Sequence, residues 1–178
     1  MKMKDPKQQI IDEIIVMDCQ GGSTEAFQLL VSRWQKRLWQ HAFRLTSDSQ
    51  AAWDITQQSG HDIIKRLPKL HDPANFKAWA YRITTNKSID WIKRKTSARQ
   101  MQIESLDCLP AEAKSDTGIK ELLDKLSAAN KAVLSLYYFE QLSISEISLA
   151  PGIPQGTVKS RMHNARKELK ELWQQNFE

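Results

Sequence analysis

The segment from residue 143 to residue 172 constrains the fold more than any other part of the sequence. It begins with Ser143-Ile-Ser-Glu146, where the serine can cap a helix and the glutamate three positions later can reach back to it. A short helix is predicted over 144–149, and Gly152 can take the positive φ of a tight turn. A second helix is predicted over 155–172. A short helix, a glycine turn and a longer helix together predict a helix-turn-helix.

The two faces of the second helix differ in chemistry. Apolar residues three and four positions apart predict its inward face: Val158, Met162, Ala165 and Leu169. The other face is polar and carries Lys159, Ser160, His163, Asn164 and Lys167. Five Lys and Arg residues against one Glu fall within 155–170. Such a helix is typical of the one that enters the DNA major groove, and an αα-hairpin with a solvated basic helix is the structural alternative.

Helical periodicity continues through most of the remaining chain. Apolar spacing and capping or breaking residues predict helices over 25–45, 50–67, 75–95, 119–126 and 128–139. Residues 96–118 show no clear period, and fully extended they could span roughly 75 Å. The predicted fold class is therefore all-α, with two small helical domains that are joined by a flexible linker and can be held apart, rather than one compact core. The predicted parts are an N-terminal segment (1–22), a helical domain (23–95), the linker (96–118) and a helix-turn-helix domain (119–178).

Composition excludes several classes of function. The 178 residues contain no run of 18 apolar residues and no apolar signal segment at the start, which predicts a cytoplasmic protein without membrane insertion. Cys19 and Cys108 are isolated in the sequence, and we interpret them as plain small residues rather than redox sensors. No His or carboxylate cluster has catalytic or metal-binding spacing, and no nucleotide, zinc-protease or hydrolase motif occurs. We therefore predict no enzyme activity, cofactor, metal or small-molecule substrate.

The net charge of +5 is concentrated in one part of the chain. Residues 23–96 contain 13 basic and 6 acidic residues. This surplus favours a polyanionic partner such as nucleic acid, although a solvated basic surface explains the charge equally well.

Two motifs resemble one protein family. The first is Asn75-Phe-Lys-Ala-Trp-Ala-Tyr-Arg-Ile-Thr-Thr-Asn-Lys-Ser-Ile-Asp-Trp-Ile-Lys-Arg94. The second is Leu142-Ser-Ile-Ser-Glu-Ile147 followed by Gly152-Ile-Pro-Gln-Gly-Thr-Val-Lys-Ser-Arg-Met-His-Asn-Ala-Arg166. In this order they resemble the small sigma factors of bacterial RNA polymerase, the extracytoplasmic function (ECF) group. The resemblance covers about residues 20–172. It implies that the first domain binds the polymerase clamp and reads the −10 promoter element, and that the second domain reads the −35 element, without catalytic activity.

The resemblance assigns the −10 element to residues of the first motif. Asn86 matches a family asparagine that takes part in capturing an unstacked base, and its amide offers donors and an acceptor to a base edge. The alternative is a helix-interior asparagine satisfied locally. Stacking and phosphate contacts with single-stranded DNA are implied for Tyr81, Arg82, Lys87, Lys93 and Arg94.

The loop before this motif and one tryptophan within it are interpreted separately. His71, Asp72 and Pro73 fall in the loop that holds the flipped base in relatives. Trp79 lies on the apolar face of its predicted helix, so we interpret it as a core residue rather than a strand-opening aromatic.

For the −35 element, the resemblance implies base contacts from Lys159, Ser160, His163 and Asn164. Lys159 can donate to a guanine edge or a phosphate, and Asn164 can pair bidentately with adenine. Many relatives have Arg at the position of Asn164, which leaves the base preference open. Phosphate contacts are implied for Arg161, Arg166, Lys167 and Thr157, the last beside the free amides of a helix N-terminus.

The helix that binds the polymerase clamp departs from the family pattern. The family has Ala-Glu-Asp, then Gln-Glu and an aromatic residue, whereas this chain has Ala52-Trp-Asp-Ile-Thr-Gln-Gln-Ser-Gly60. Asp54 and Gln57 match, and Trp53 is either an exposed hot spot or a core residue. Gly60 in mid-helix costs about 1 kcal/mol relative to Ala. We expect the packing to be rebuilt where the family has its aromatic side chain.

The predicted function is a sigma factor that binds core RNA polymerase and directs promoter-specific initiation. The alternative is a helix-turn-helix regulator that binds duplex DNA without polymerase. Such regulators usually dimerise on two-fold sites, and the sequence shows no heptad seam or additional domain for a dimer. The resemblance implies three partners: core RNA polymerase, promoter DNA and an anti-sigma factor.

Overall fold

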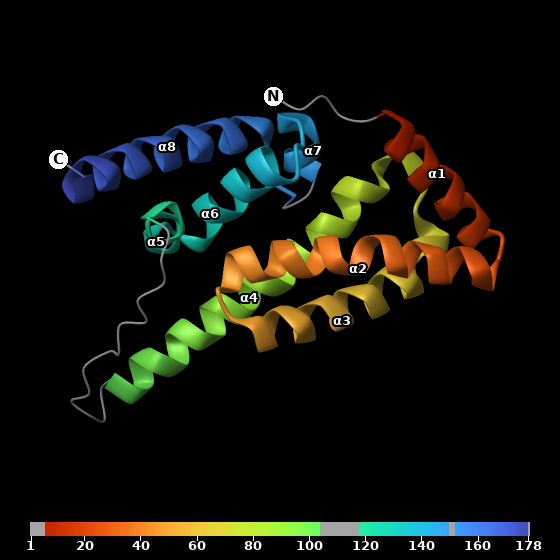
Figure 1. The fold of residues 1–178 in the computed structure, drawn as a ribbon, viewed down its shortest axis with the longest axis horizontal. Helices are drawn as coiled ribbons and strands as arrows, with labels where there is room; N and C mark the ends of the chain where they lie inside the picture. The colour runs from red at the N-terminus through yellow and green to blue at the C-terminus, as the bar shows by residue number, and fades with distance from the viewer. Residues whose placement is uncertain (1–5, 104–117, 150–151, 178) are drawn as a thin grey trace.

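Helices form the whole framework of the computed structural model, which describes residues 6–103, 118–149 and 152–177 (Figure 1). No strand occurs in these ranges, so the all-α prediction is confirmed. The first group is α1 (Pro6–Gln20), α2 (Thr24–Thr46), α3 (Ser49–Arg66) and α4 (Phe76–Ile103), with the single turns η1 (Leu67–Lys69) and η2 (Pro73–Asn75) between α3 and α4. The second group is α5 (Gly118–Lys125), α6 (Ala128–Leu134), the π-helical turn η3 (Ser135–Phe139), α7 (Ile144–Leu149) and α8 (Gln155–Phe177).

Local capping explains where the predicted helices begin. The Ser23 hydroxyl accepts a hydrogen bond from the Ala26 amide at 3.1 Å and starts α2. The Asp48 carboxylate accepts from the Ala51 amide at 3.0 Å and starts α3. These two helices follow their sequence predictions within one or two residues.

Two segments differ from the sequence prediction. The N-terminal segment forms α1, which packs on α2 and buries Ile15, Val16 and Cys19. Helix α4 continues to Ile103, so the prediction of a structureless linker is wrong for residues 96–103. Burial raises the pKa of the Cys19 thiol, which disfavours the reactive thiolate, and Cys108 lies outside the described residues.

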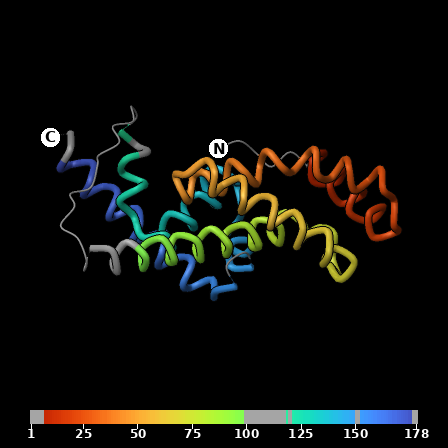
Figure 2. The backbone as a smooth tube through the Cα atoms, turned by 90° about the horizontal axis from the view of Figure 1, so that it is seen from below, coloured from red at the N-terminus to blue at the C-terminus, as the bar shows by residue number. Residues whose placement is uncertain are grey.

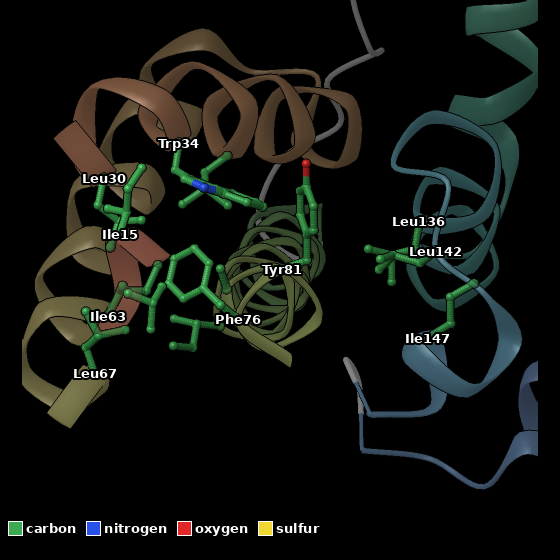
Figure 3. Packing of buried hydrophobic residues seen from close by; sticks show 14 of the residues in the cluster. Ile15, Leu30, Trp34, Ile63, Leu67, Phe76, Tyr81, Leu136, Leu142 and Ile147 are labelled. Carbon is green, nitrogen blue, oxygen red and sulfur yellow. The ribbon is translucent and has the colours of Figure 1, made fainter. Parts of the chain in front are cut away.

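One cluster of buried side chains spans both groups of helices (Figure 3). Trp34 packs edge-on against Phe76 and Tyr81, with ring centroids 5.1 and 5.8 Å apart. The same cluster continues into Leu136 and Leu142 of the second group. The two predicted helical groups therefore pack together in this arrangement and share buried side chains, where the sequence predicts separate cores. Figure 2 shows the backbone from below, with the second group of helices lying against α2 and α4.

Polar contacts also join the two groups of helices. The Glu140 carboxylate, just after η3, accepts hydrogen bonds from the Arg44 guanidinium of α2 and from the Tyr81 hydroxyl of α4. Burial raises the pKa of the Tyr81 phenol, so it remains a donor. His41 is fully buried beside this group, and its Nε2 lies 2.8 Å from Thr85 Oγ1. Burial and the nearby Arg44 lower the pKa of His41 to about 3, which keeps it neutral.

We expect Glu140→Ala to loosen the contact between the two groups of helices. The change leaves the partly buried Arg44 guanidinium and the Tyr81 hydroxyl without their acceptor, at a cost of about 1–3 kcal/mol. Small-angle scattering should then show a larger radius of gyration than for the unchanged chain. Glu171→Ala, which removes an exposed carboxylate, is the matched control and should leave the radius unchanged. An unaltered radius for Glu140→Ala would contradict this role.

Candidate nucleic-acid interface

The turn between α7 and α8 has the geometry of a helix-turn-helix. The Ser143 amide donates to the Glu146 carboxylate at 2.8 Å, and the Glu146 amide donates to the Ser143 hydroxyl at 3.3 Å, which is the predicted capping box. Gly152 has φ +68°, as the turn requires. The Ser148 hydroxyl donates to the Ile153 carbonyl at 2.7 Å, which closes the turn. Pro151 lies outside the described residues.

Helix α8 presents the polar face that the sequence predicts. Val158, Met162 and Ala165 are buried, and the opposite face is exposed. The predicted base-reading residues on that face are Lys159, Ser160, His163 and Asn164. The Ser160 hydroxyl donates to the Thr157 carbonyl at 3.0 Å, so this side chain is already engaged with its own helix. The face therefore offers one ammonium, one imidazole and one amide to a major groove.

The predicted phosphate contacts of α8 do not all point the same way. Thr157 and Arg161 are half-buried near the start of the helix, whereas Lys167 is exposed and lies 3.8 Å from Glu171. The Arg166 guanidinium donates to the Tyr138 hydroxyl at 3.0 Å and lies over the rings of Tyr137 and Tyr138. Arg166 is thus held against the π-helical turn η3 in this arrangement.

One side of α4 forms a second polar stripe. Positions 79, 82, 86 and 93 are three, four and seven residues apart, so they lie on the same side of the helix. Arg82, Asn86 and Lys93 are all exposed. Lys87 and Arg94 occupy a neighbouring side. Lys87 pairs with Asp62 at 2.9 Å, and Arg94 Nε donates to the Asp90 carbonyl at 3.3 Å.

Tyr81 is not part of this stripe. It is 1% exposed and lies on the side of α4 that faces the second group of helices (Figure 3). In this arrangement Tyr81 cannot stack on a base, because its ring is enclosed and its hydroxyl is bound to Glu140, so the predicted stacking requires the two groups of helices to separate.

An open pocket of about 400 Å³ lies at the N-terminal end of the stripe. Its walls combine basic, aromatic and hydrogen-bonding groups from α3, the following loop and α4: Arg66, Lys69, Leu70, His71, Asp72, Asn75 and Trp79. Trp79 is only partly buried, so its interpretation as a core residue is incomplete. The sequence signal for the pocket is the helical spacing of Asn75 and Trp79 with Arg82 and Asn86.

The two polar surfaces approach each other in this arrangement. A Cβ atom added at Gly152, in the turn before α8, would lie 3.3 Å from Arg82 Nη2 of α4. The helix-turn-helix therefore covers part of the α4 stripe.

Helix α3 places the predicted polymerase-binding residues on the surface. Asp54 and Gln57 are exposed. Trp53 is 41% exposed, and its ring centroid lies 5.7 Å from that of Trp39. Trp53 is therefore a surface residue whose ring packs against a second tryptophan. An apolar groove of about 370 Å³ lies between α2 and α3 and includes Gly60, where an added Cβ would meet no atom within 4 Å. The packing at Gly60 is left open rather than rebuilt.

Within 6–103, 118–149 and 152–177, no three His, Cys, Asp or Glu residues lie close enough together to hold a metal ion. In these ranges, no helix has both the length and the apolar character to cross a bilayer.

Two family models match this chain, one in each group of helices. Residues 30–98 match the family described as Sigma-70 region 2, and residues 117–169 match Sigma-70, region 4. RNA polymerase sigma factor SigV of Bacillus subtilis is 30% identical over 129 residues, covering 71% of this chain and 78% of SigV. ECF RNA polymerase sigma factor SigW of the same species is 29% identical over 167 residues, covering 84% and 89%. ECF RNA polymerase sigma factor SigE of Mycolicibacterium smegmatis is 29% identical over 153 residues, covering 80% of this chain but only 59% of SigE.

Two solved structures share the fold. CnrH, solved in complex with the cytosolic domain of CnrY, superposes with a TM-score of 0.72 at 24% identity, over 93% of this chain and 98% of CnrH. The sigma factor RpoE of Bartonella quintana, solved with the anti-sigma factor NepR, gives a TM-score of 0.67 at 23% identity, over 86% and 99%.

Proposed function

This chain belongs to the sigma-70 family of bacterial RNA polymerase sigma factors, in its ECF group, and we propose on that premise that it directs promoter-specific transcription initiation. In this proposal the chain binds core RNA polymerase and brings it to promoters with a −10 and a −35 element. The catalytic chemistry belongs to the polymerase, and this chain contributes recognition, in the cytoplasm, without a cofactor or substrate of its own.

The observation that carries the proposal is the continuous α4 surface. A pocket with basic and aromatic walls opens beside the stripe of Trp79, Arg82, Asn86 and Lys93. Single-stranded DNA needs these features together, because cations follow the phosphates while an aromatic wall and amides accept an unstacked base. A conventional duplex-DNA regulator requires only the α8 face. The α4 surface therefore favours the sigma factor over the regulator.

Helix α8 supplies the duplex-reading half of the proposal. Lys159 and Asn164 project from the exposed face near the start and middle of α8, where a recognition helix meets base edges. In this assignment the helical domain of residues 23–95 takes the −10 element, and the domain of residues 119–178 takes the −35 element.

Promoter binding requires the two groups of helices to separate. The names of the two elements place them about 25 base pairs apart, which is roughly 85 Å of duplex. In the described arrangement the turn before α8 touches Arg82 of α4. We therefore propose that the hydrogen bonds from Arg44 and Tyr81 to Glu140 break when the chain binds polymerase and promoter.

An anti-sigma factor is the third proposed partner. The structure of RpoE from Bartonella quintana was solved with the anti-sigma factor NepR, and it has the fold of this chain. An anti-sigma factor would act by holding the closed arrangement or by covering the α3 surface.

We expect Asn86→Ala to reduce promoter opening roughly tenfold while leaving the fold intact. Asn86 is exposed on α4, so its loss removes base-edge hydrogen bonds without opening a cavity. Permanganate footprinting of the −10 element measures the open complex. Ser97→Ala, an exposed change further along the same helix, is the control. Equal open-complex yields for Asn86→Ala and Ser97→Ala would remove Asn86 from base recognition.

Binding to core polymerase tests the α3 surface. Trp53→Ala removes an exposed aromatic of the kind that dominates interfaces, so we expect the affinity to fall about tenfold or more. Trp173→Ala, a half-exposed tryptophan near the end of α8, is the control. An affinity unchanged by Trp53→Ala would show that polymerase binds elsewhere on the chain.

A further inference from the structure

Helix α1 holds the loop between α3 and α4 through hydrogen bonds. Gln20, the last residue of α1, reaches residues far along the chain with its side-chain amide. Its Nε2 donates to the Leu67 carbonyl at 3.0 Å and to the Leu70 carbonyl at 2.8 Å. An amide nitrogen has two N–H groups, so both donors are used on this loop.

These two carbonyls belong to the turn that begins the pocket loop. Leu67 is fully buried, and its carbonyl also accepts from the Leu70 amide at 3.0 Å. Leu70 itself lines the pocket with Arg66 and Lys69. Gln20 thus fixes the backbone of the segment that carries the basic side of the pocket.

The other end of the loop is held by its own residues. The Asp72 carboxylate accepts from the Ala74 amide at 3.0 Å and from the Asn75 side chain at 2.8 Å. His71 lies between these two sets of hydrogen bonds and lines the pocket. The loop is therefore fixed on both sides of His71, once from α1 and once from within.

Helix α1 is itself firmly anchored. Ile15, Val16 and Cys19 are buried in the common core. The Asp12 carboxylate accepts from Arg33 Nε of α2 at 2.9 Å. A side chain on such a helix can hold a loop in one position, because its own backbone has little freedom.

We propose that Gln20 is a positioning residue for −10 recognition, which pre-organises the 67–70 turn and the pocket that accepts an unstacked promoter base. This inference rests on the proposed function, because it assumes that the pocket reads the −10 element. Gln20 does not touch DNA. It acts through the Leu67 and Leu70 carbonyls, and its contribution is selectivity, since a pocket held in one shape discriminates between bases better than one that adapts.

The test uses Gln20→Met, which keeps the length of the side chain and removes both donors. Gln20→Lys keeps N–H donors at a similar reach and serves as the rescue. Gln9→Met makes the same change at an exposed position of α1, away from the pocket, and is the control. With the full chain and core polymerase, initiation is measured on promoters that carry each of the four bases at the −10 positions. Affinity for a duplex −35 element is measured separately.

We expect Gln20→Met to lose about fivefold in base discrimination at the −10 element with unchanged −35 affinity. Gln20→Lys and Gln9→Met should retain the discrimination. Unchanged discrimination in Gln20→Met would overturn the inference while leaving the proposed function in place. An equal loss at both elements, or failure of Gln20→Lys to rescue, would also overturn it and show a merely structural role. If the unchanged chain does not initiate at all, the proposed function fails and the inference fails with it.

Discussion

Replacing Lys159 and Asn164 together by Ala should weaken recognition of the −35 element by about 2–6 kcal/mol. Both side chains are exposed on α8, with Val158, Met162 and Ala165 anchoring the opposite face. A well-placed bidentate contact to a base is worth about 1–3 kcal/mol, and the two residues supply one contact each. The expected loss of affinity is therefore about 30-fold to 10⁴-fold.

The measurement compares a selected −35 duplex with a scrambled one at a single salt concentration. The double variant should lose most of its preference for the selected sequence. Lys170→Ala removes one exposed positive charge from the same helix and should weaken both duplexes slightly and equally. If the double variant weakened both duplexes by the same factor, Lys159 and Asn164 would be phosphate ligands rather than base readers.

Replacing Trp34 by Ala should destabilise the chain by about 3–5 kcal/mol. Trp34 is 2% exposed and belongs to the cluster that α1, α2, α3 and α4 share with the second group of helices. The change removes its edge contacts with Phe76 and Tyr81 and leaves a cavity the size of an indole. Because Tyr81 carries the hydrogen bond to Glu140, the loss should also loosen the contact between the two groups.

Urea unfolding followed by circular dichroism measures this effect. Trp173→Ala is a control in which the same side chain is removed from a position that is 48% exposed, and it should cost less than about 1 kcal/mol. A free energy of unfolding that changed equally in both variants would contradict the central place of Trp34. Two separate transitions in the unchanged chain would show that the shared core does not unfold as one unit.

Local signals explain why much of the fold could be predicted. Ser23, Asp48 and Ser143 each cap a helix that the sequence marks by apolar residues three and four apart. Gly152 adopts the positive φ expected of the helix-turn-helix. The polar face of α8 follows from the same spacing, because a helix that buries Val158 and Met162 on one side exposes the opposite side.

The sequence pattern does not predict helix α1, because its apolar residues do not form a single stripe. Ile15 and Val16 are buried, but Ile10, Ile14 and Met17 are exposed on other sides of the helix. The role of Gln20 depends on the carbonyls of Leu67 and Leu70, and no local sequence pattern predicts a contact between residues so far apart in the chain.

The contact between the two halves could not be predicted for a related reason. Glu140 and Arg44 are charged residues, which usually lie on the surface, and their pairing joins positions far apart in the sequence. Tyr81 stands beside exposed residues of the α4 stripe, but one step along a helix turns a side chain to a different face. That turn places Tyr81 against Glu140 instead of toward DNA.

Transcription reconstituted from purified components decides whether this chain acts as a sigma factor. The chain is mixed with core RNA polymerase and a library of promoter fragments, and the transcript start sites are sequenced. We expect transcripts that depend on the chain and share two upstream elements, at −10 and −35. Binding of the chain to duplex DNA without polymerase-dependent initiation would contradict a sigma-factor function and would favour a conventional helix-turn-helix regulator.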